Sequence, residues 1–345
     1  MIVGLGGGIG ASRLWRAIAG AVPAEDLTCV VNTAEDLWDH GLRVCPDLDT
    51  VLYALSGRQD VERGWGVAGE SFRCMDQLRS LGEDIWFNLG DVDLATHLFR
   101  TGRLRMGTSL SAVTGELATA LGVRARVMPM TDADVRTVVV TAAGERLPYQ
   151  EFLVRRGARD AVASFRYEGI EGARPAPGVL EAIAEADLVV IGPSNPVASI
   201  GPILEVAGVR EALVATRAPV VAVTPVVTGV PVTDPGEAGR ARSRAALLRA
   251  IGREHRAASV AELYRAVADA FVVDEADADE VDPIAAMGLA VLVAPTLAAD
   301  VLADRLLDWK ADKADLQPYQ VVDTWMAGLH QGLASGSPSA GPADR

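Results

Sequence analysis

Carboxylates are concentrated in one stretch of the chain, "VVNTAEDLWDHGLRVCPDLDT". They follow the apolar run "LTCVV" and include Asp36, Asp47 and Asp49. Carboxylate oxygens are the ligands that Mg²⁺ prefers, and a bound Mg²⁺ keeps coordination positions for water and substrate phosphate. The stretch therefore predicts a magnesium site or a proton-transfer group among these three side chains. The plainer alternative is that Asp47 or Asp49 caps the helix predicted from "TVLYAL".

A glycine-rich segment, "GLGGGIGASR", joins the first apolar run to the first predicted helix. Backbone N–H groups at such a turn can approach phosphate oxygens, and the helix dipole favours negative charge there. A tight turn alone can also require glycines. The glycines predicted to contact a phosphate are Gly6, Gly7, Gly8 and Gly10.

Polar side chains also follow a later apolar run, in "IGPSNPVASIGPIL". Ser194 and Asn195 stand between two prolines that shape the turn. These side chains either bind a ligand or belong to an ordinary turn that leads to a helix capped by Ser199. The residue pattern leaves both alternatives open.

Acidic and basic side chains occur together in "NLGDVDLATHLFRTGRL". Asp91 and Asp93 precede a predicted helix that carries His97 and Arg100. A lone histidine is most often a satisfied packing residue. Arg100 lies three residues on, on the same helix face, where it could meet an anion.

The composition excludes several classes of protein. The chain has 345 residues, half of them apolar, and a formal net charge of -14, which disfavours binding to duplex nucleic acid. No apolar run reaches the roughly 20 residues that a membrane helix needs. The N-terminal residues do not resemble a secretory signal, so we expect a cytoplasmic protein. Three cysteines without C-x-x-C spacing argue against a disulfide framework and a structural zinc site.

Apolar runs that alternate with helical periodicity predict the fold class. They indicate an α/β protein with a Rossmann-like, mainly parallel sheet flanked by helices. Residues 137–170 lack helical periodicity and predict a small antiparallel insert. We expect a single Rossmann-like domain over residues 1–330 and a disordered tail at 334–345, where Gly, Ser and Pro predominate. Further strands are predicted at "IWFNLG", "DLVVIG", "VVAVTPVV", "AFVVDE" and "LAVLVAP".

The loops that carry these polar residues should meet at one place. The carboxyl ends of parallel strands lie at the same edge of a sheet, so the glycines, the carboxylates and the Ser-Asn turn should share one crevice. That combination suits transfer of a phosphorylated group from a nucleotide-linked donor.

Several motifs together resemble the 2-phospho-L-lactate transferase family, from residue 1 to about residue 310. They are "GGGIGASRL", "VVNTAEDLWDHGLRVCPDLDTVLYALSG", "LGDVDLATHLFRT", "LSAVTGEL", "MPMTDADVRT" and "IGPSNPVASIGPIL". The resemblance implies a magnesium-dependent, Rossmann-like homodimer of coenzyme F-420 biosynthesis. Such enzymes take a guanosine diphosphate-linked donor and pass its phosphorylated lactate, enolpyruvate or glycerate to the ribityl hydroxyl of 7,8-didemethyl-8-hydroxy-5-deazariboflavin (Fo). GMP is released, and the enolpyruvyl donor is typical of bacterial relatives.

The resemblance also implies roles for individual residues. The glycine loop, Ser194 and Asn195 would bind the guanosine diphosphate. Asp49 and Asp36 would be the catalytic carboxylates, with Asp49 as the acceptor contact or base. The residues implied on the deazaflavin and metal side are Thr33, Asp36, His40 and Asp49.

The chain departs from the family pattern at two places. Val92 stands where many relatives have the arginine of "LGDRD", and Arg100 or Arg103 could compensate for it. Thr233 and Asp234 stand where relatives tend to carry a basic residue or a small Gly-rich turn. Both departures concern the substrate rather than the fold.

Two alternatives compete with the transferase. A nicotinamide-dependent oxidoreductase would need an acidic residue at the end of the second strand, where the chain has Asn32 and Thr33. A non-catalytic nucleotide-binding protein would bind GDP without turnover, but such a protein has no need for clustered carboxylates.

The sequence generates one mutational prediction. Asp49→Ala should abolish transfer and leave the fold intact, because Asp49 is expected to act on the acceptor hydroxyl. A transfer assay on the purified variant, with circular dichroism to verify folding, measures both effects. Normal turnover of the variant would remove the role assigned to Asp49.

Overall fold

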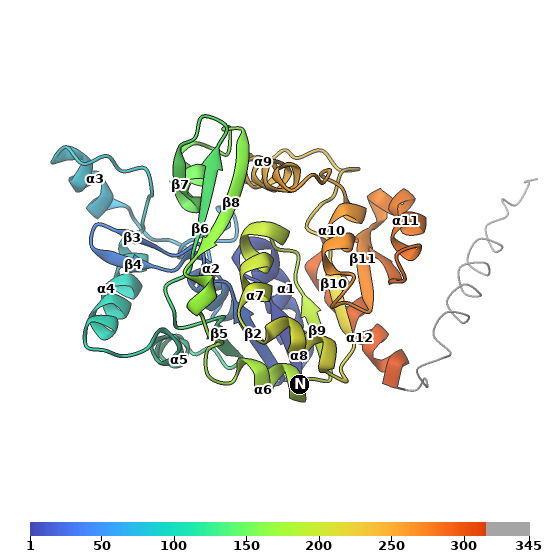
Figure 1. Ribbon diagram of the computed structural model, residues 1–345. Helices are drawn as coiled ribbons and strands as arrows, with labels where there is room; N and C mark the ends of the chain where they lie inside the picture. Colours follow the sequence, from blue (N-terminus) through green and yellow to red (C-terminus); the bar gives the residue numbers. More distant parts are fainter. Residues whose placement is uncertain (315–345) are drawn as a thin grey trace, which may run out of the picture. The chain divides into compact units, whose positions relative to one another are not determined.

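A seven-stranded parallel sheet forms the centre of the computed structural model, which describes residues 1–314 (Figure 1). Every neighbouring pair of strands is parallel, which confirms the predicted Rossmann-like α/β fold. In spatial order the strands are β12 (Ala290–Ala294), β11 (Ala270–Asp274), β10 (Val220–Val223), β9 (Leu188–Ile191), β1 (Ile2–Leu5), β2 (Leu27–Val31) and β5 (Arg126–Pro129).

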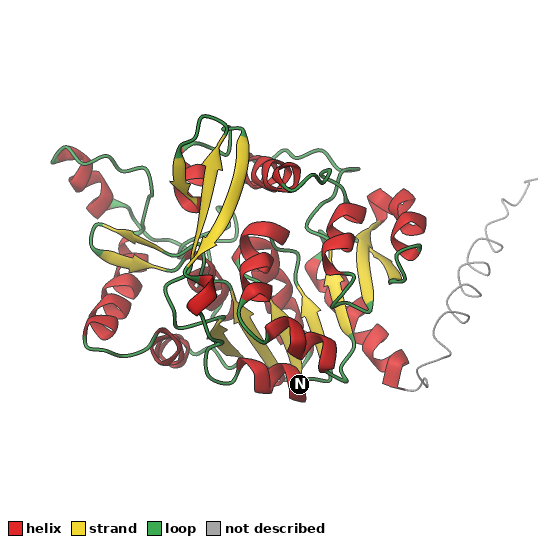
Figure 2. Ribbon diagram, in the orientation of Figure 1, coloured by secondary structure: helices red, strands yellow, loops and turns green. Residues whose placement is uncertain are grey.

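Helices cover both faces of this sheet (Figure 2). Contacts group α1, α2 and α5 with β2 and β5, and they group α6, α7 and α8 with one another. The helices are α1 (Gly8–Ala21), α2 (Pro46–Leu55), α3 (Arg73–Ser80), α4 (Asp91–Arg105), α5 (Leu110–Leu121), α6 (Val179–Glu185), α7 (Gly201–Glu205), α8 (Val209–Ala215), α9 (Pro235–Ala250), α10 (Ala257–Tyr264), α11 (Val281–Ala285) and α12 (Ala299–Ala314).

Smaller antiparallel elements supplement the main sheet. The predicted insert is a sheet in the order β7-β6-β8, made of β6 (Arg136–Thr141), β7 (Arg146–Pro148) and β8 (Val162–Glu168). The turn with Gly144 joins β6 to β7 as expected, and β8 adds a third strand that packs beside α9 (Figure 1). A hairpin of β3 (Leu37–Asp39) and β4 (Leu42–Val44) follows β2 and was not predicted.

One predicted strand is wrong. The residues of "IWFNLG" form a loop between α3 and α4, although their apolar run fits a buried strand. Ile85 and Phe87 pack against a small cluster that includes Met75 and Leu89. These apolar side chains therefore pack outside the sheet. An apolar run in a buried loop has the same sequence pattern as a buried strand.

The described residues divide at Asp304. Residues 1–303 form one compact unit, and the part of α12 that follows is assigned to a second unit. The predicted domain end at residue 330 and the predicted disordered tail at 334–345 lie outside the described residues. Among residues 1–314, none of the helices has the length and apolar composition to cross a membrane.

Close packing joins α1 to the middle of the sheet. The Trp15 ring is fully buried against Gly4 in β1 and Gly192 at the end of β9. A Cβ atom would lie 2.7 Å from this ring at Gly4 and 2.8 Å from it at Gly192. The indole Nε1 also donates to the carbonyl of Gly6 at 3.4 Å. These glycines are therefore required by the approach of Trp15, which fixes where the loop after β1 begins.

This packing generates a stability prediction. Gly4→Ala should lower the free energy of unfolding by about 1–3 kcal/mol, because the added methyl overpacks the Trp15 ring. Gly20→Ala in α1 is the matched control, since a Cβ there meets nothing within 4 Å. The control should be neutral or stabilising by up to about 1 kcal/mol, as expected for Gly→Ala in a helix. Urea unfolding of both variants measures the difference, and equal stabilities would contradict the assigned packing.

Candidate functional site

A large cavity lies where the strand order of the sheet reverses. β1 pairs with β2 on one side and with β9 on the other, so the loops after β1 and β9 diverge at its carboxyl end. Open α/β sheets bind ligands at this switch point. A cavity of about 770 Å³ occurs there, and the loops after both strands line it.

The glycine loop lines this cavity through Gly7, Gly8 and Gly10. Gly6 lies behind the loop, where a Cβ would be 2.7 Å from the Ser194 Oγ. A Cβ at Gly7 would lie 2.5 Å from the Asp47 side chain. Packing therefore requires glycine at these positions whether or not a phosphate binds, and contact with a phosphate stays a prediction.

The turn after β9 holds this loop in place. Ser194 donates to the Gly7 carbonyl at 2.8 Å. Asn195 caps the π-helical turn Pro196–Ile200 by accepting from the N–H groups of Val197 and Ala198, both at 3.0 Å. Ser194 and Asn195 also line the cavity. The cap is thus Asn195 rather than Ser199.

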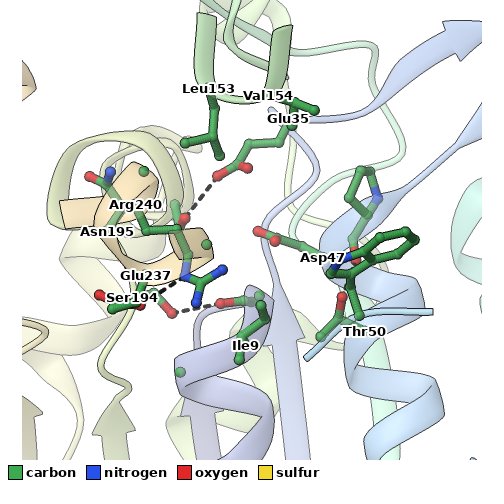
Figure 3. A pocket seen from close by; sticks show the side chains of 18 of the residues that line it. Ile9, Glu35, Asp47, Thr50, Leu153, Val154, Ser194, Asn195, Glu237 and Arg240 are labelled. Carbon is green, nitrogen blue, oxygen red and sulfur yellow. Dashed lines mark hydrogen bonds and ion pairs between the residues drawn. The ribbon is translucent and has the colours of Figure 1, made fainter. Parts of the chain in front are cut away.

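Two carboxylates are buried at the base of the glycine loop. The Asn32 amide donates to Glu35 at 3.3 Å and to Asp47 at 2.9 Å, so one side chain bridges both groups. Glu35 also accepts from Ser199 at 2.8 Å and from Gln150 at 3.0 Å, and Figure 3 shows Glu35 and Asp47 facing the same cavity. The residue at the end of β2 therefore bonds protein carboxylates, and the nicotinamide alternative gains no support.

Burial changes the titration of these carboxylates. It raises the pKa of Asp47 to about 7, against the opposing effect of the Asn32 hydrogen bond. Burial, and then the nearby Asp47 charge, raise the pKa of Glu35 well above its usual value. Glu35 was not among the predicted site residues, and its position beside Asp36 in the acidic stretch was the available signal.

Asp36 faces away from the main cavity. The Arg43 guanidinium donates to Asp36 at 3.1 Å and to Asp134 at 3.2 Å. Burial raises the pKa of Asp36 to about 6, although the Arg43 charge opposes this. Asp36 lines a separate cavity of about 230 Å³ under the antiparallel insert.

A chain of polar contacts links α2 to α4. Arg100 donates through both terminal nitrogens to the Asp49 carboxylate, and the His97 ring lies between Asp49 (3.6 Å) and Asp93 (3.2 Å). The Tyr53 hydroxyl donates to Asp93 at 2.6 Å. The anion that Arg100 meets is therefore Asp49 of the same chain.

The described residues contain one group suited to a metal ion: Asp49, Asp93 and His97, whose donor atoms all lie within 4.8 Å of one another. The predicted trio of Asp36, Asp47 and Asp49 is not gathered in this way, because Arg43 and Asn32 hold the first two elsewhere. Two carboxylates suit Mg²⁺, whereas an imidazole is a less usual ligand for it. Neither Asp47 nor Asp49 is the helix cap, since α2 begins after Cys45.

Aromatic side chains line the other half of the cavity. Trp65, Trp86 and Phe87 come from the loops around α3 and are only partly buried. The Arg63 guanidinium lies over the Trp65 ring at 4.6 Å from its centre. The sequence did not assign these residues to the site, and the apolar run at Trp86 and Phe87 was interpreted as a strand.

The structure places the remaining candidates outside the main cavity. His40 forms the tip of the β3–β4 hairpin with a φ of 46°. Thr33 is buried and does not line the cavity. Arg103 pairs with Glu116 on the surface, and neither it nor Arg100 lines the cavity in place of the arginine that Val92 replaces. The predicted residues that do line it are Gly7, Gly8, Gly10, Asp47, Asp49, Ser194 and Asn195.

The fold and the site define a Rossmann-like α/β protein whose main cavity is lined by a glycine loop and by aromatic side chains, here called its glycine-loop half and its aromatic half. The family model described as 2-phospho-L-lactate transferase CofD matches residues 2–293, so the chain belongs to this transferase family. Family membership confirms the resemblance found in the sequence.

Individual relatives agree with this assignment. A phosphoenolpyruvate transferase of Streptomyces coelicolor is 44% identical over 305 residues, which cover 87% of this chain and 93% of that protein. A 2-phospho-L-lactate transferase of Methanosarcina acetivorans is 42% identical over 277 residues, 80% of this chain and 87% of that protein. A solved structure of a Bacillus halodurans protein has a TM-score of 0.58 at 19% identity, over 89% of this chain and 98% of that one, and supports the fold alone.

The raised pKa of Asp47 generates a pH-dependent prediction. Between about pH 4 and pH 7 the folded protein keeps a proton that the unfolded chain has released, so this group's contribution to stability is lost as pH rises through that window. Asp47→Asn cannot ionise and retains an oxygen for the Asn32 amide. The unfolding free energy of Asp47→Asn minus that of the wild type should therefore increase from about pH 4 to about pH 7 and then level off.

Urea unfolding at several pH values, in a buffer with a chelator, measures this gain. Asp76→Asn is the control, because Asp76 is an exposed carboxylate on α3 paired with Arg79. The control should show no comparable increase. A difference between Asp47→Asn and wild type that is independent of pH would contradict the buried, proton-binding state of Asp47.

Proposed function

We propose that the protein transfers a phosphorylated three-carbon acid from a guanosine diphosphate-linked donor to the ribityl hydroxyl of Fo, with release of GMP. The observation that carries this proposal is the cavity of about 770 Å³, which the glycine loop, the carboxylates of α2 and the aromatic side chains all line. Relatives named phosphoenolpyruvate transferase and 2-phospho-L-lactate transferase support the class of group transferred. Coenzyme F-420 biosynthesis is the pathway in which this reaction would serve.

The glycine-loop half suits the donor. Loop amides at the start of α1 and the positive end of the helix dipole favour phosphate oxygens at Gly7, Gly8 and Gly10. Ser194 and Asn195 border the same space and offer polar groups to the nucleotide. GMP would remain in this half after its bond to the transferred phosphorus breaks.

The aromatic half suits the acceptor. A deazaflavin is a flat, mostly apolar ring system, and indole side chains bind such rings by stacking and by burial of apolar area. Trp65 and Trp86 line the cavity, as do Tyr53 and Asp49 of α2. An acceptor ring placed there would direct its ribityl chain toward the phosphates.

Asp49 is positioned to act on the attacking hydroxyl. It lines the same cavity as the glycine loop and the aromatic side chains, and Arg100 and His97 fix the orientation of its carboxylate. A carboxylate so held can accept the hydroxyl proton or orient the oxygen for in-line attack. We propose that Asp49 and Asp93 hold Mg²⁺, which when bound neutralises phosphate charge. We also propose that the protein is a cytoplasmic homodimer.

A competition assay tests the proposed reaction. Purified protein with magnesium and Fo would receive equal amounts of the lactyl, enolpyruvyl and phosphoglyceryl guanosine donors, and mass spectrometry would resolve the products. One dominant product is expected, the enolpyruvyl or the lactyl one, and omission of magnesium should stop its formation. If GDP binds but no donor reacts, the transferase proposal fails.

Because Asp49 pairs with the buried Arg100, Asp49→Asn is a better test of Asp49 than Asp49→Ala. Asp49→Ala would leave the Arg100 charge buried without its partner, which costs about 3–5 kcal/mol and confuses a loss of folding with a loss of activity. Asp49→Asn retains the shape and one acceptor oxygen. We expect it to lower kcat by at least about 100-fold, the usual contribution of a positioned acid or base, with little change in the binding of GDP. A kcat within a few-fold of wild type would exclude the catalytic role.

A further inference from the structure

Helix α9 supplies most of the positive charge around the cavity. The arginines that line the cavity are Arg13, Arg240, Arg242 and Arg244, and three of them belong to α9. Carboxylates dominate the base of the glycine-loop half, where Glu35 and Asp47 lie. A diphosphate entering this half needs compensating cations, and α9 is the element that provides them.

The start of α9 is built so that its charges converge. Asp234 caps the helix by accepting from the Glu237 N–H at 2.6 Å, and Pro235 occupies the first turn. Glu237, Arg240 and Arg244 follow at spacings of three and four residues, which place them on one helix face. The position where Asp234 replaces the expected basic residue is therefore the N-cap of a helix that carries arginines.

Glu237 lies between the two arginines of this face. Its carboxylate accepts from Arg240 Nε at 2.8 Å and from Arg244 at 2.6 Å. Burial opposes the charge of Glu237, but the charges of Arg244 and Arg240 hold its pKa below the usual value. Arg244 is only 9% exposed, and its Nε has no hydrogen-bond partner among the described residues. The buried Arg244 guanidinium, which lines the cavity, therefore has an N–H group that the Glu237 carboxylate does not bond.

Contacts with the insert hold α9 over the donor half. The Ser243 hydroxyl lies 2.9 Å from the Tyr149 hydroxyl, which also accepts a hydrogen bond from the Asn195 amide at 3.3 Å. Arg242 donates to the Gly157 carbonyl at 3.0 Å. Figure 3 shows Arg240 and Glu237 on the side of the cavity where Ser194 and Ile9 of the glycine loop lie. The arginine face is therefore anchored to the same turn that borders the glycine loop.

We propose that Arg240 and Arg244 form the anion-binding wall for the donor diphosphate, and that Glu237 occupies this wall as a counter-ion until the phosphate displaces it. This assignment deepens the proposed function and rests on it for the identity of the donor. A phosphate carries more charge than a carboxylate and accepts more hydrogen bonds, so it competes well for two guanidinium groups. Glu237 in turn stabilises the arginine pair in the free protein.

Binding of GDP and of pyrophosphate to the full chain, measured by isothermal titration calorimetry, tests this assignment. Arg240→Gln should weaken GDP binding about tenfold or more, as for the loss of a charge-assisted hydrogen bond, and should reduce its dependence on salt. Arg240→Lys should restore part of the affinity. Arg249→Gln is the matched control, because Arg249 is exposed on the same helix outside the cavity and its loss changes the net charge equally.

Glu237→Gln distinguishes a counter-ion from a ligand contact. Removal of a competing anion should tighten GDP binding about two- to fivefold, whereas loss of a carboxylate that bonds the nucleotide base would weaken it. Weaker binding would overturn the counter-ion role, and an Arg240→Gln affinity within twofold of Arg249→Gln would overturn the anion-binding wall. Thermal unfolding of each variant verifies folding.

The two probes separate this inference from the proposed function. Failure of the wild type to bind GDP would remove the guanosine donor, yet pyrophosphate binding that depends on Arg240 would still support the wall. GDP binding that ignores Arg240 would remove the wall and leave the transferase proposal standing.

Discussion

Burial of carboxylates is the constraint on which the site depends. A charged carboxylate away from water must be paired, hydrogen-bonded or protonated, and this chain uses all three solutions. Arg43 and Arg100 pair with Asp36 and Asp49, whereas Asp47 is bridged by an amide and has a raised pKa. The dense acidic stretch therefore folds against the sheet with partners from its own neighbourhood, Asn32 and Arg43, and with Arg100 from α4.

These pairings divide the carboxylates by task. The ion pair with Arg100 orients Asp49, which lines the main cavity. Asp36, held by Arg43, supports the insert and faces another cavity. Asp36 and Asp49 lie close in sequence but have different surroundings, because the β3–β4 hairpin and α2 place them at different cavities.

The carboxylates around the cavity also require positive charge to balance them. The glycine loop lies against Asp47, an arrangement that disfavours a diphosphate unless positive charge in the cavity lining compensates for it. Helix α9 brings that charge, and Glu237 keeps its arginines paired in the free protein. Tight packing of Trp15 on β1 fixes the loop on one side, and contacts with the insert fix α9 on the other.

The sequence by itself determined the parallel α/β fold, the glycine loop, the acidic stretch and the family, because apolar periodicity and contiguous motifs are local signals. Only the tertiary structure decided which carboxylates face the cavity, since the Asp49–Arg100 contact joins residues 51 positions apart. It also decided that the cavity lining includes Trp86, whose apolar run resembled a strand, and Arg240, whose helix showed no motif. Long-range proximity, which composition and spacing do not encode, assembles these side chains into one site.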